Sequence, residues 1–217
     1  MKSVNKVYLE GLVDRFSRME DLGGGRCLAS IGLVTYHKGK DGEVLPLHHE
    51  VYYSGQETDV EPIGRELESS GGRAVIPVAV SGCLGPRPHA AAGASDVVVL
   101  AEDTGFARVA RIGNTDNNSM SLSGRVVSMS FTDSDATLVI DADGSRVRTR
   151  IIRKDNEDAW KMVSDGRIRR GGAVSMSGVL VTRQFMSQDS VRNFVVPVVY
   201  SLQQLRLRRE VEKGVKI

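Results

Sequence analysis

The hydrophobic and polar positions along the chain alternate in short segments that are separated by turn residues. In "SRVRTRIIRK" (145–154), Val147, Thr149 and Ile151 alternate with arginines, and in "LHHEVYYSG" (47–55) His49, Val51 and Tyr53 alternate with His48, Glu50 and Tyr52. This period of two is typical of β-strands, in which successive side chains point to opposite faces of a sheet. Glycine-rich connections such as "LGGGR" (22–26) supply the turns. The pattern predicts an all-β protein with two short helical segments, at 59–69 and 156–166.

The two halves of the chain repeat the same landmarks in the same order. The segments "NKVYLEGLV" (5–13) and "NSMSLSGRV" (118–126) share Asn, Leu, Gly and Val at matching places. Later in each half, a Gly-Gly pair leads into a strand that ends in Ser-Gly-x-Leu, at 81–84 and 177–180. A helical segment precedes each of these strands and a further apolar strand follows it. We infer an internal duplication.

Each half then contains three strands, a short helix and two more strands. This order is typical of the OB-fold, a five-stranded Greek-key barrel. An immunoglobulin-like sandwich needs about seven strands and has no place for the helix. We predict two tandem OB-fold barrels, each with a short helix between strands 3 and 4. The polar linker "IGNTDNNS" (112–119) divides them into domains at 1–112 and 113–217.

The composition indicates a soluble globular protein. Of the 217 residues, 41% are hydrophobic and 26% are charged, which are ordinary values. The apolar runs are too short to span a bilayer, and "MKSVNKVYLEG" (1–11) lacks the apolar segment of a signal peptide. Two cysteines are too few for a disulfide framework. We expect a reduced, cytoplasmic protein that does not contact membranes.

The charges are distributed unevenly between the halves. Residues 1–112 hold 12 basic and 15 acidic residues, a net charge of −3, whereas residues 113–217 hold 17 and 12, a net charge of +5. This asymmetry suggests that the second half meets an anionic partner. Its most regular basic feature is the set Arg146, Arg148 and Arg150, which a strand would place on one face. Such a ridge is either a solvated strand face or part of a polyanion-binding surface.

The sequence resembles the bacterial single-stranded DNA-binding protein family. The segment "GRIRRGGAVSMSGVLVTRQFMSQDSVRNFVVPVVYSLQQL" (166–205) is similar to that family's helix end, fourth strand, long hairpin and fifth strand. The opening "NKVYLEG" (5–11) is similar to its first strand. The resemblance covers most of 118–205 and, more loosely, 4–111. It implies OB-folds that bind single-stranded DNA, four of which are usually assembled in one oligomer.

The chain departs from the pattern of this family in two places. Family members usually end in an acidic tail that recruits replication enzymes, whereas this sequence ends in "RREVEKGVKI" (208–217), which has mixed charge. The family also stacks bases on several tryptophans, and this sequence has one, Trp160. These departures fit a divergent member, such as a specialised paralogue, a mobile-element protein or a primosome-type accessory protein.

Candidate binding residues follow from the chemistry of single-strand recognition, in which cations neutralise phosphates and aromatic rings stack on bases. In the family, the third strand of the barrel binds the nucleic acid. The family's long hairpin carries Thr-Arg, a basic residue and Trp where this chain has "TRQF" (182–185). A loop aromatic can instead pack on its own barrel or on a partner subunit. The predicted nucleic-acid-binding residues are Arg146, Arg148, Arg150, Lys154, Arg167, Arg183, Phe185, Phe131 and Tyr52. Trp160, in a helical segment, is expected in the core.

The first half is expected to bind more weakly or to serve in assembly. The alternation in "LHHEVYYSG" places His48, Glu50 and Tyr52 on the outer face of the strand, with His49, Val51 and Tyr53 pointing inward. Tyr52 is a candidate for stacking, but Glu50 would repel phosphate.

Enzymatic readings have little support in the sequence. The four histidines all lie in the first half, and no carboxylate or cysteine has a ligand-like spacing to them. "LGGGRC" (22–27) lacks the Lys-Ser/Thr end of a phosphate-binding loop. No Gly-x-Ser-x-Gly nucleophile motif is present. We therefore expect no catalytic activity, no metal and no cofactor.

These features predict a tandem OB-fold protein that binds single-stranded DNA with little sequence preference, in replication, repair or recombination. RNA is a further candidate ligand. The alternative is a protein–protein module or architectural subunit of a replication or mobile-element complex that binds little nucleic acid itself. The aromatic content of 5% favours this alternative, and the arginine ridge favours binding. A homodimer would present four OB-folds.

Overall fold

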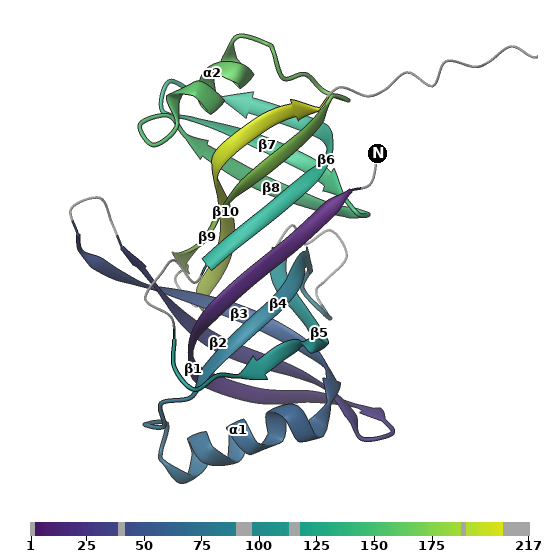
Figure 1. The fold of residues 1–217 in the computed structure, drawn as a ribbon, viewed down its shortest axis with the longest axis vertical. Coiled ribbons are helices and arrows are strands. Elements are labelled where there is room, and N and C mark those ends of the chain that lie inside the picture. The colour runs from purple at the N-terminus through teal and green to yellow at the C-terminus, as the bar shows by residue number, and fades with distance from the viewer. Residues whose placement is uncertain (1–2, 39–41, 90–96, 113–117, 188–189, 206–217) are drawn as a thin grey trace, which may run out of the picture.

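The protein is described here by a computed structural model that covers residues 3–38, 42–89, 97–112, 118–187 and 190–205; between 183 and 194 it gives the backbone only. Within these residues the chain forms β-strands and two helices (Figure 1). In chain order they are β1 (Val4–Gly23), β2 (Arg26–Lys38), β3 (Val44–Gln56), α1 (Glu57–Ser69), β4 (Pro77–Pro86), β5 (Val97–Arg108), β6 (Asn118–Phe131), β7 (Asp135–Ala142), β8 (Ser145–Ile152), α2 (Glu157–Ser164), β9 (Ala173–Ser187) and β10 (Ser190–Leu205).

The strands close into two barrels with the same order of pairing. Strands β1 to β5 pair in the order β1–β2–β3–β5–β4 and return to β1, and β6 to β10 pair as β6–β7–β8–β10–β9 and return to β6. The third and fifth strands of each barrel are parallel, and the remaining pairs are antiparallel. A helix follows the third strand in both. The predicted all-β fold of two tandem OB-folds is therefore confirmed, whereas the domain boundary at residue 112 stays a prediction.

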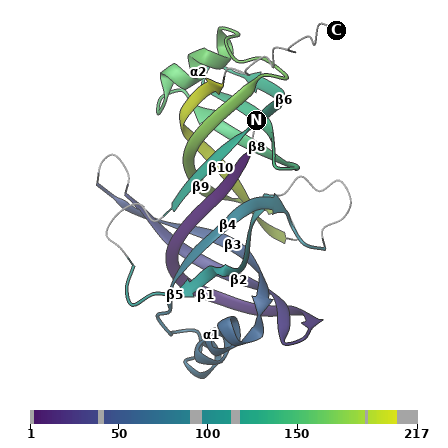
Figure 2. The ribbon, with the colours of Figure 1, turned by 45° about the vertical axis from the view of Figure 1, so that its right-hand side comes forward.

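The two barrels are joined by the pairing of their first strands. β1 and β6 run antiparallel from Val4 opposite Ser123 to Leu9 opposite Asn118. The molecule is elongated along this junction, with α1 at the end of one barrel and α2 at the far end of the other (Figures 1 and 2). No helix in the described ranges is long and apolar enough to cross a membrane.

The repeated sequence landmarks mark a hydrogen-bonded clamp in each barrel. The side chain of Asn5 donates to the backbone oxygen of Leu84 over 2.7 Å and accepts from its N–H over 2.9 Å. Asn118 makes the same two bonds with Leu180, over 2.7 and 2.8 Å. The Asn that opens each first strand thus holds the Leu of the matching Ser-Gly-x-Leu. This shared geometry gives a physical reason for the repeat.

The glycine of Ser-Gly-x-Leu is required by close packing of backbones. A Cβ at Gly82 would overlap the carbonyl of Leu100, and one at Gly178 would overlap the carbonyl of Val198. In both barrels this is the place where the fourth strand crosses the fifth. A side chain there would separate the two strands.

Strand β8 has the register that its alternation predicts. Val147, Thr149 and Ile151 are fully buried, and the Thr149 hydroxyl donates to the Leu138 carbonyl over 3.2 Å. The turn that precedes β8 contains Asp143 and Gly144, which both have positive φ, as a tight two-residue hairpin turn requires. The turn and the alternation together fix which side chains of β8 face outward.

A buried polar network crosses the junction between the barrels. The ring of His49, 3% exposed, hydrogen-bonds through Nε2 with Thr35 Oγ1 over 2.8 Å and lies 3.4 Å from Asn118 Nδ2. Its Nδ1 has no hydrogen-bond partner in the part of the chain that the structure describes. Burial, with a smaller effect of neighbouring His48, lowers the pKa of His49 to about 4. His49 is therefore neutral in the folded protein at pH 7.

This histidine should make stability depend on pH. Because its pKa is lower when folded than the ordinary 6.5, the unfolded chain binds more protons between the two values. Its contribution is complete above pH 6.5 and is lost as the pH falls towards 4, by about 3 kcal/mol in total. Urea unfolding of wild type and His49→Gln at pH 7, 6 and 5 should give a flatter pH dependence for the variant. Equal slopes would contradict this account.

Candidate nucleic-acid interface

The outer face of β8 carries the predicted arginine ridge. Arg146 and Arg148 are exposed and Arg150 is half-buried, so the three guanidinium groups point away from the core that the alternate residues fill. Successive members are about 7 Å apart along the strand. Neither Arg146 nor Arg148 forms an ion pair with any residue that the structure describes. Two of the three cations are therefore available to an anion.

On β7 and β6, most of the side chains that lie opposite the arginine ridge are small and uncharged. Opposite Arg148 and Arg150, β7 presents Val139 and Thr137. Beyond them, β6 presents Ser128 and Ser130 in the same rows. Only the row of Arg146 contains a carboxylate, that of Asp141. The result is a surface of small side chains with a line of arginines along one side.

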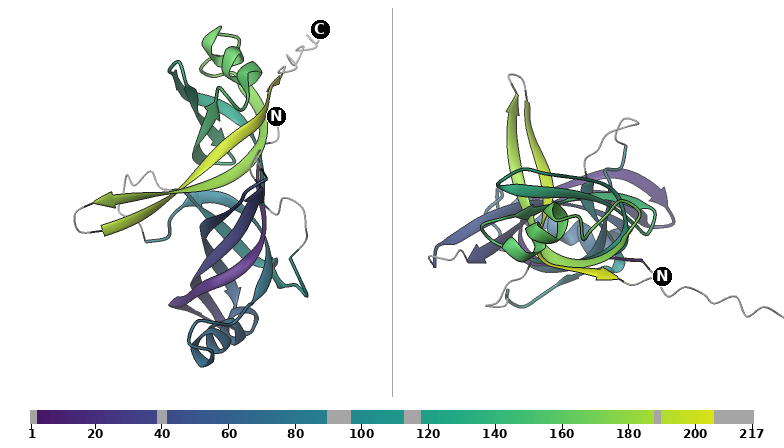
Figure 3. Two further views of the ribbon diagram at one scale, coloured as in Figure 1. Left: turned by 90° about the vertical axis from the view of Figure 1, so that its left-hand side faces the viewer. Right: turned by 90° about the horizontal axis from the view of Figure 1, so that it is seen from above.

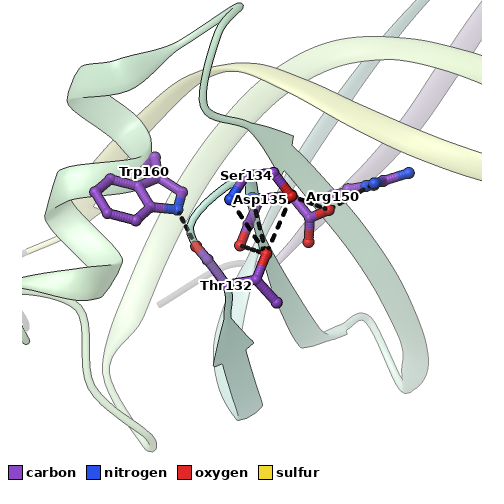
Figure 4. Close-up of polar contacts among 5 residues, drawn as sticks. All are labelled: Thr132, Ser134, Asp135, Arg150 and Trp160. Atoms are coloured by element: carbon purple, nitrogen blue, oxygen red, sulfur yellow. Dashed lines mark hydrogen bonds and ion pairs between the residues drawn. The ribbon is translucent and has the colours of Figure 1, made fainter.

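Arg150 is held by a carboxylate at the end of the ridge. Its Nη2 donates to Asp135 Oδ2 over 2.5 Å. Asp135 begins β7, after a turn in which the Thr132 hydroxyl accepts from the N–H groups of Ser134 and Asp135 over 3.3 and 3.2 Å (Figure 4). Phosphate would have to compete with Asp135 for Arg150. This arginine is thus a weaker candidate than Arg146 and Arg148.

Phe131 and Trp160 lie at the end of the second barrel, beside this turn. Phe131 is 51% exposed but pairs with Ala136 in an inward-facing row, and its ring meets Trp160 edge-on at 6.5 Å. Trp160 donates from Nε1 to the Thr132 carbonyl over 3.0 Å (Figure 4). The Arg153 guanidinium lies 4.3 Å from the centre of its indole ring. Trp160 packs against the core as predicted, but it is only half-buried.

Two further charged candidates, Lys154 and Arg167, lie in the segments that flank α2. Lys154 is exposed in the turn after β8, where a pocket of about 470 Å³ is lined by Arg150, Arg153 and Lys154 and by Asp133, Asp135 and Glu157. Arg167 lies 3.8 Å from Asp165, beyond the end of α2. The pocket is balanced in charge, so it adds less to an anion-binding surface than the ridge does.

Arg183 and Phe185 lie in the long β9–β10 hairpin, which projects from the body of the molecule (Figure 3). The prediction placed Phe185 in a loop, but residues 182–187 continue strand β9. The extension is regular because each residue from Thr182 to Ser187 pairs with one on β10. The side chains of Arg183 and Phe185 are outside the described part of the structure.

The matching face of the first barrel is closed by ion pairs. Glu50 contacts Arg87 at 2.8 Å and Arg15 at 3.8 Å. The outward position predicted for Tyr52 is right in register, but its ring is only 4% exposed. It packs with Leu28 and Val98 beneath Arg87, whose guanidinium is 5.7 Å from the ring centre. A base cannot stack on Tyr52 while this arrangement persists, so the prediction of a stacking site there is not supported.

The burial of Tyr52 also affects its chemistry. Burial, followed by the nearby Glu50 carboxylate, raises the pKa of the Tyr52 hydroxyl. The hydroxyl donates to Glu50 over 3.1 Å and accepts from Arg87 over 2.9 Å. A pocket of about 320 Å³ beside this network includes Thr182 and Val195 of the β9–β10 hairpin. No group of three or more potential metal ligands occurs in the described ranges.

Sequence reasoning missed two features of this surface. Arg87 covers Tyr52, and Arg153 stacks on Trp160. The spacing of Arg153 to Trp160 spans the start of a helix, so a cation–aromatic pair there could have been proposed. Nothing in the sequence places Arg87 near Tyr52, because the contact joins β3 to the segment after β4.

The whole chain superposes on solved structures. No protein-family model and no curated protein matches the sequence. A deletion mutant of the single-stranded DNA-binding protein from Thermus aquaticus matches with a TM-score of 0.65 and 16% identity, over 98% of this chain and 99% of that chain. The wild-type Thermus aquaticus protein matches with a TM-score of 0.63 and 17% identity, over 95% of each chain.

The chain therefore has the fold of these two Thermus aquaticus structures. Because both barrels are matched over almost the full length, the resemblance seen in the sequence holds for the fold as a whole. At this level of identity the likeness concerns the fold, and the binding residues must be argued from this chain.

Proposed function

We propose that the protein binds single-stranded DNA without marked sequence preference, through the outer face of β7 and β8. The observation that carries this proposal is the ridge itself: Arg146 and Arg148 are exposed, while Val147 and Thr149, which alternate with them, are fully buried. The Thermus aquaticus proteins of the same fold are single-stranded DNA-binding proteins, which supports the same ligand here. The protein has no catalytic role in this proposal.

The ridge would act on the phosphate backbone and on the bases in different ways. Each guanidinium offers a planar set of N–H donors that can bind two phosphate oxygens at once, and its flat face can stack on a base. Val139 and Thr137 beside the ridge leave room for a single strand of DNA to lie on this face. These contacts carry no base-edge recognition, so the binding would be largely independent of sequence.

The first barrel would contribute mainly to assembly. Glu50 lies where the second barrel has its arginines, and its two ion pairs occupy Arg87 and Arg15. A DNA strand that bound to this face would have to break these two ion pairs. Binding is therefore concentrated in the second barrel.

Salt dependence tests this proposal against a purely architectural role. If the ridge and its neighbours contact about four phosphates, the affinity for oligo-dT should fall with log salt at a slope of roughly −3, or about −0.7 per contact. Fluorescence anisotropy at several salt concentrations measures it. Absence of binding even at low salt would reject nucleic-acid binding and leave an architectural subunit.

We also propose that the chain forms a homodimer with four OB-folds, through the outer face of β4, β1, β6 and β9. Strands β4 and β9 flank β1 and β6 in one continuous sheet. Its outer face carries several serines and Tyr8, which is 39% exposed, and a groove of about 640 Å³ there is lined by Ser81, Ser119 and Ser121 together with Lys6 and Glu102. A sheet face in which serines outnumber charged side chains can pack against its own copy about a two-fold axis.

Mass measurement tests the assembly. Light scattering over micromolar concentrations should give twice the chain mass of 23.6 kDa. Tyr8→Glu places a charge in the middle of the face and should shift the mass towards that of one chain. A monomer mass for wild type at all concentrations would reject the dimer.

A further inference from the structure

Arg125 lies in line with one end of the arginine ridge, although the sequence analysis assigns it no role. In the antiparallel ladders, Arg125 of β6 stands opposite Asp141 of β7, and Asp141 stands opposite Arg146 of β8. The next row, formed by Val126, Ile140 and Val147, is fully buried or nearly so. Arg125 therefore points outward on the same surface as Arg146, two strand spacings or about 10 Å away.

A second cation, Arg170, is exposed in the turn that leads into β9. The N–H of Gly171 donates to the Val126 carbonyl over 2.8 Å, and the N–H of Val126 donates to Gly172 over 2.9 Å. These bonds extend the β6–β9 pairing to Val126, the residue after Arg125, and Arg170 directly precedes this paired segment. Both arginine side chains are exposed. Arg125 and Arg170 thus belong to neighbouring, hydrogen-bonded segments of the second barrel.

Neither arginine is neutralised by a neighbour. In the described parts of the chain, Arg125 and Arg170 form no ion pair, and Asp141 forms none with Arg125 or Arg146. This differs from the opposite end of the ridge, where Asp135 holds Arg150. Asp141 is the one carboxylate in the row, and it faces two arginines. The unneutralised positive charge is therefore greater at the Arg146 end.

We propose that Arg125 and Arg170 extend the nucleic-acid interface around the second barrel, so that a single strand leaves the ridge at Arg146 and crosses β7 and β6. The inference rests on the proposed function, since the ligand is the same strand. The proposal specifies where the DNA strand runs beyond Arg146 and makes the binding site longer than the ridge alone. A short oligonucleotide would be held by the ridge alone, and only a longer one would reach Arg125 and Arg170.

The double variant R125E/R170E separates this extension from general electrostatics. Its control is R65E/R73E, which makes the same change of charge at exposed positions in the first barrel. Affinities are measured for oligo-dT of about 5 and about 16 nucleotides, the range that one OB-fold covers. For the longer strand, R125E/R170E should lose at least about tenfold in affinity, and its salt slope should be shallower by about 1.4. For the short oligonucleotide, the two variants should have equal affinities.

Each outcome has a definite meaning. Equal losses for R125E/R170E and its control on the longer strand would overturn the proposal, as would equal losses on both lengths for R125E/R170E alone. Failure of wild type to bind any oligo-dT would instead reject the proposed function itself. The neutral variant R125Q/R170Q gives the same comparison if charge reversal disturbs folding, with a smaller expected loss of about threefold on the longer strand.

Discussion

Reversing the charge of Arg146, Arg148 and Arg150 together should abolish the binding of oligo-dT at physiological salt. The variant R146E/R148E/R150E turns up to three phosphate contacts into repulsions on the face where the proposed strand lies. An affinity loss of more than about a thousandfold is expected, since three phosphate contacts are lost and replaced by repulsions. The barrel should stay folded because Val147, Thr149 and Ile151, which fill the core from this strand, are unchanged.

The matched control changes as much charge elsewhere. R65E/R73E/R111E reverses three exposed arginines of the first half and should weaken oligo-dT binding only slightly. Circular dichroism and thermal unfolding must show that both triple variants are folded. If both lose affinity equally, the protein acts only through its net charge. If neither loses affinity while wild type binds, the ridge is a solvated face and binding lies elsewhere.

Replacing Asn118 with alanine should destabilise the protein by about 3 kcal/mol. Asn118 is 3% exposed and satisfies both the N–H and the carbonyl of Leu180. The alanine variant leaves these two backbone groups buried without their partner, and each such loss costs about 1–3 kcal/mol. Urea unfolding at pH 7 measures the change in free energy.

Asn5 provides a control with the same geometry in the other barrel. It makes the same bonds with Leu84 but is only partly buried, so water can replace them in part and Asn5→Ala should cost less. Ser119→Ala, next to Asn118 and exposed, should be nearly neutral. An Asn118→Ala variant as stable as wild type would show that the clamp is not the reason for the repeated motif.

The alternation of side chains was sufficient to predict the register of β8. Arginine cannot be buried without a partner, while Val147 and Ile151 gain from burial, so only one register satisfies both. The order of elements was equally predictable, because the glycine turns and the two helical segments divide each half in the same way. The paired asparagines and the Ser-Gly-x-Leu sequences pointed to the duplication for a reason now visible: each pair forms one clamp.

What the sequence could not predict is which distant segment covers a given face. The alternation placed Tyr52 outward correctly, but its ring is covered by Arg87, which follows a different strand. The pairing of Arg150 with Asp135 likewise depends on cross-strand register between β7 and β8. Phe131 was predicted to bind nucleic acid. It is exposed, but its row faces inward and its ring lies at the barrel end against Trp160. These outcomes depend on contacts between segments, which a periodic pattern does not encode.

Labelling of individual arginines tests the central claim most directly. An arginine-specific dicarbonyl reagent, followed by mass spectrometry, reports the reactivity of each guanidinium with and without saturating oligo-dT at low salt. Arg146 and Arg148 should react readily in the free protein, because they are exposed without an ion-pair partner in the described structure, and should be protected when the strand is bound. Arg73 of the first barrel should react equally in both states. Unchanged reactivity of Arg146 and Arg148 in a protein that has bound oligo-dT would contradict the account.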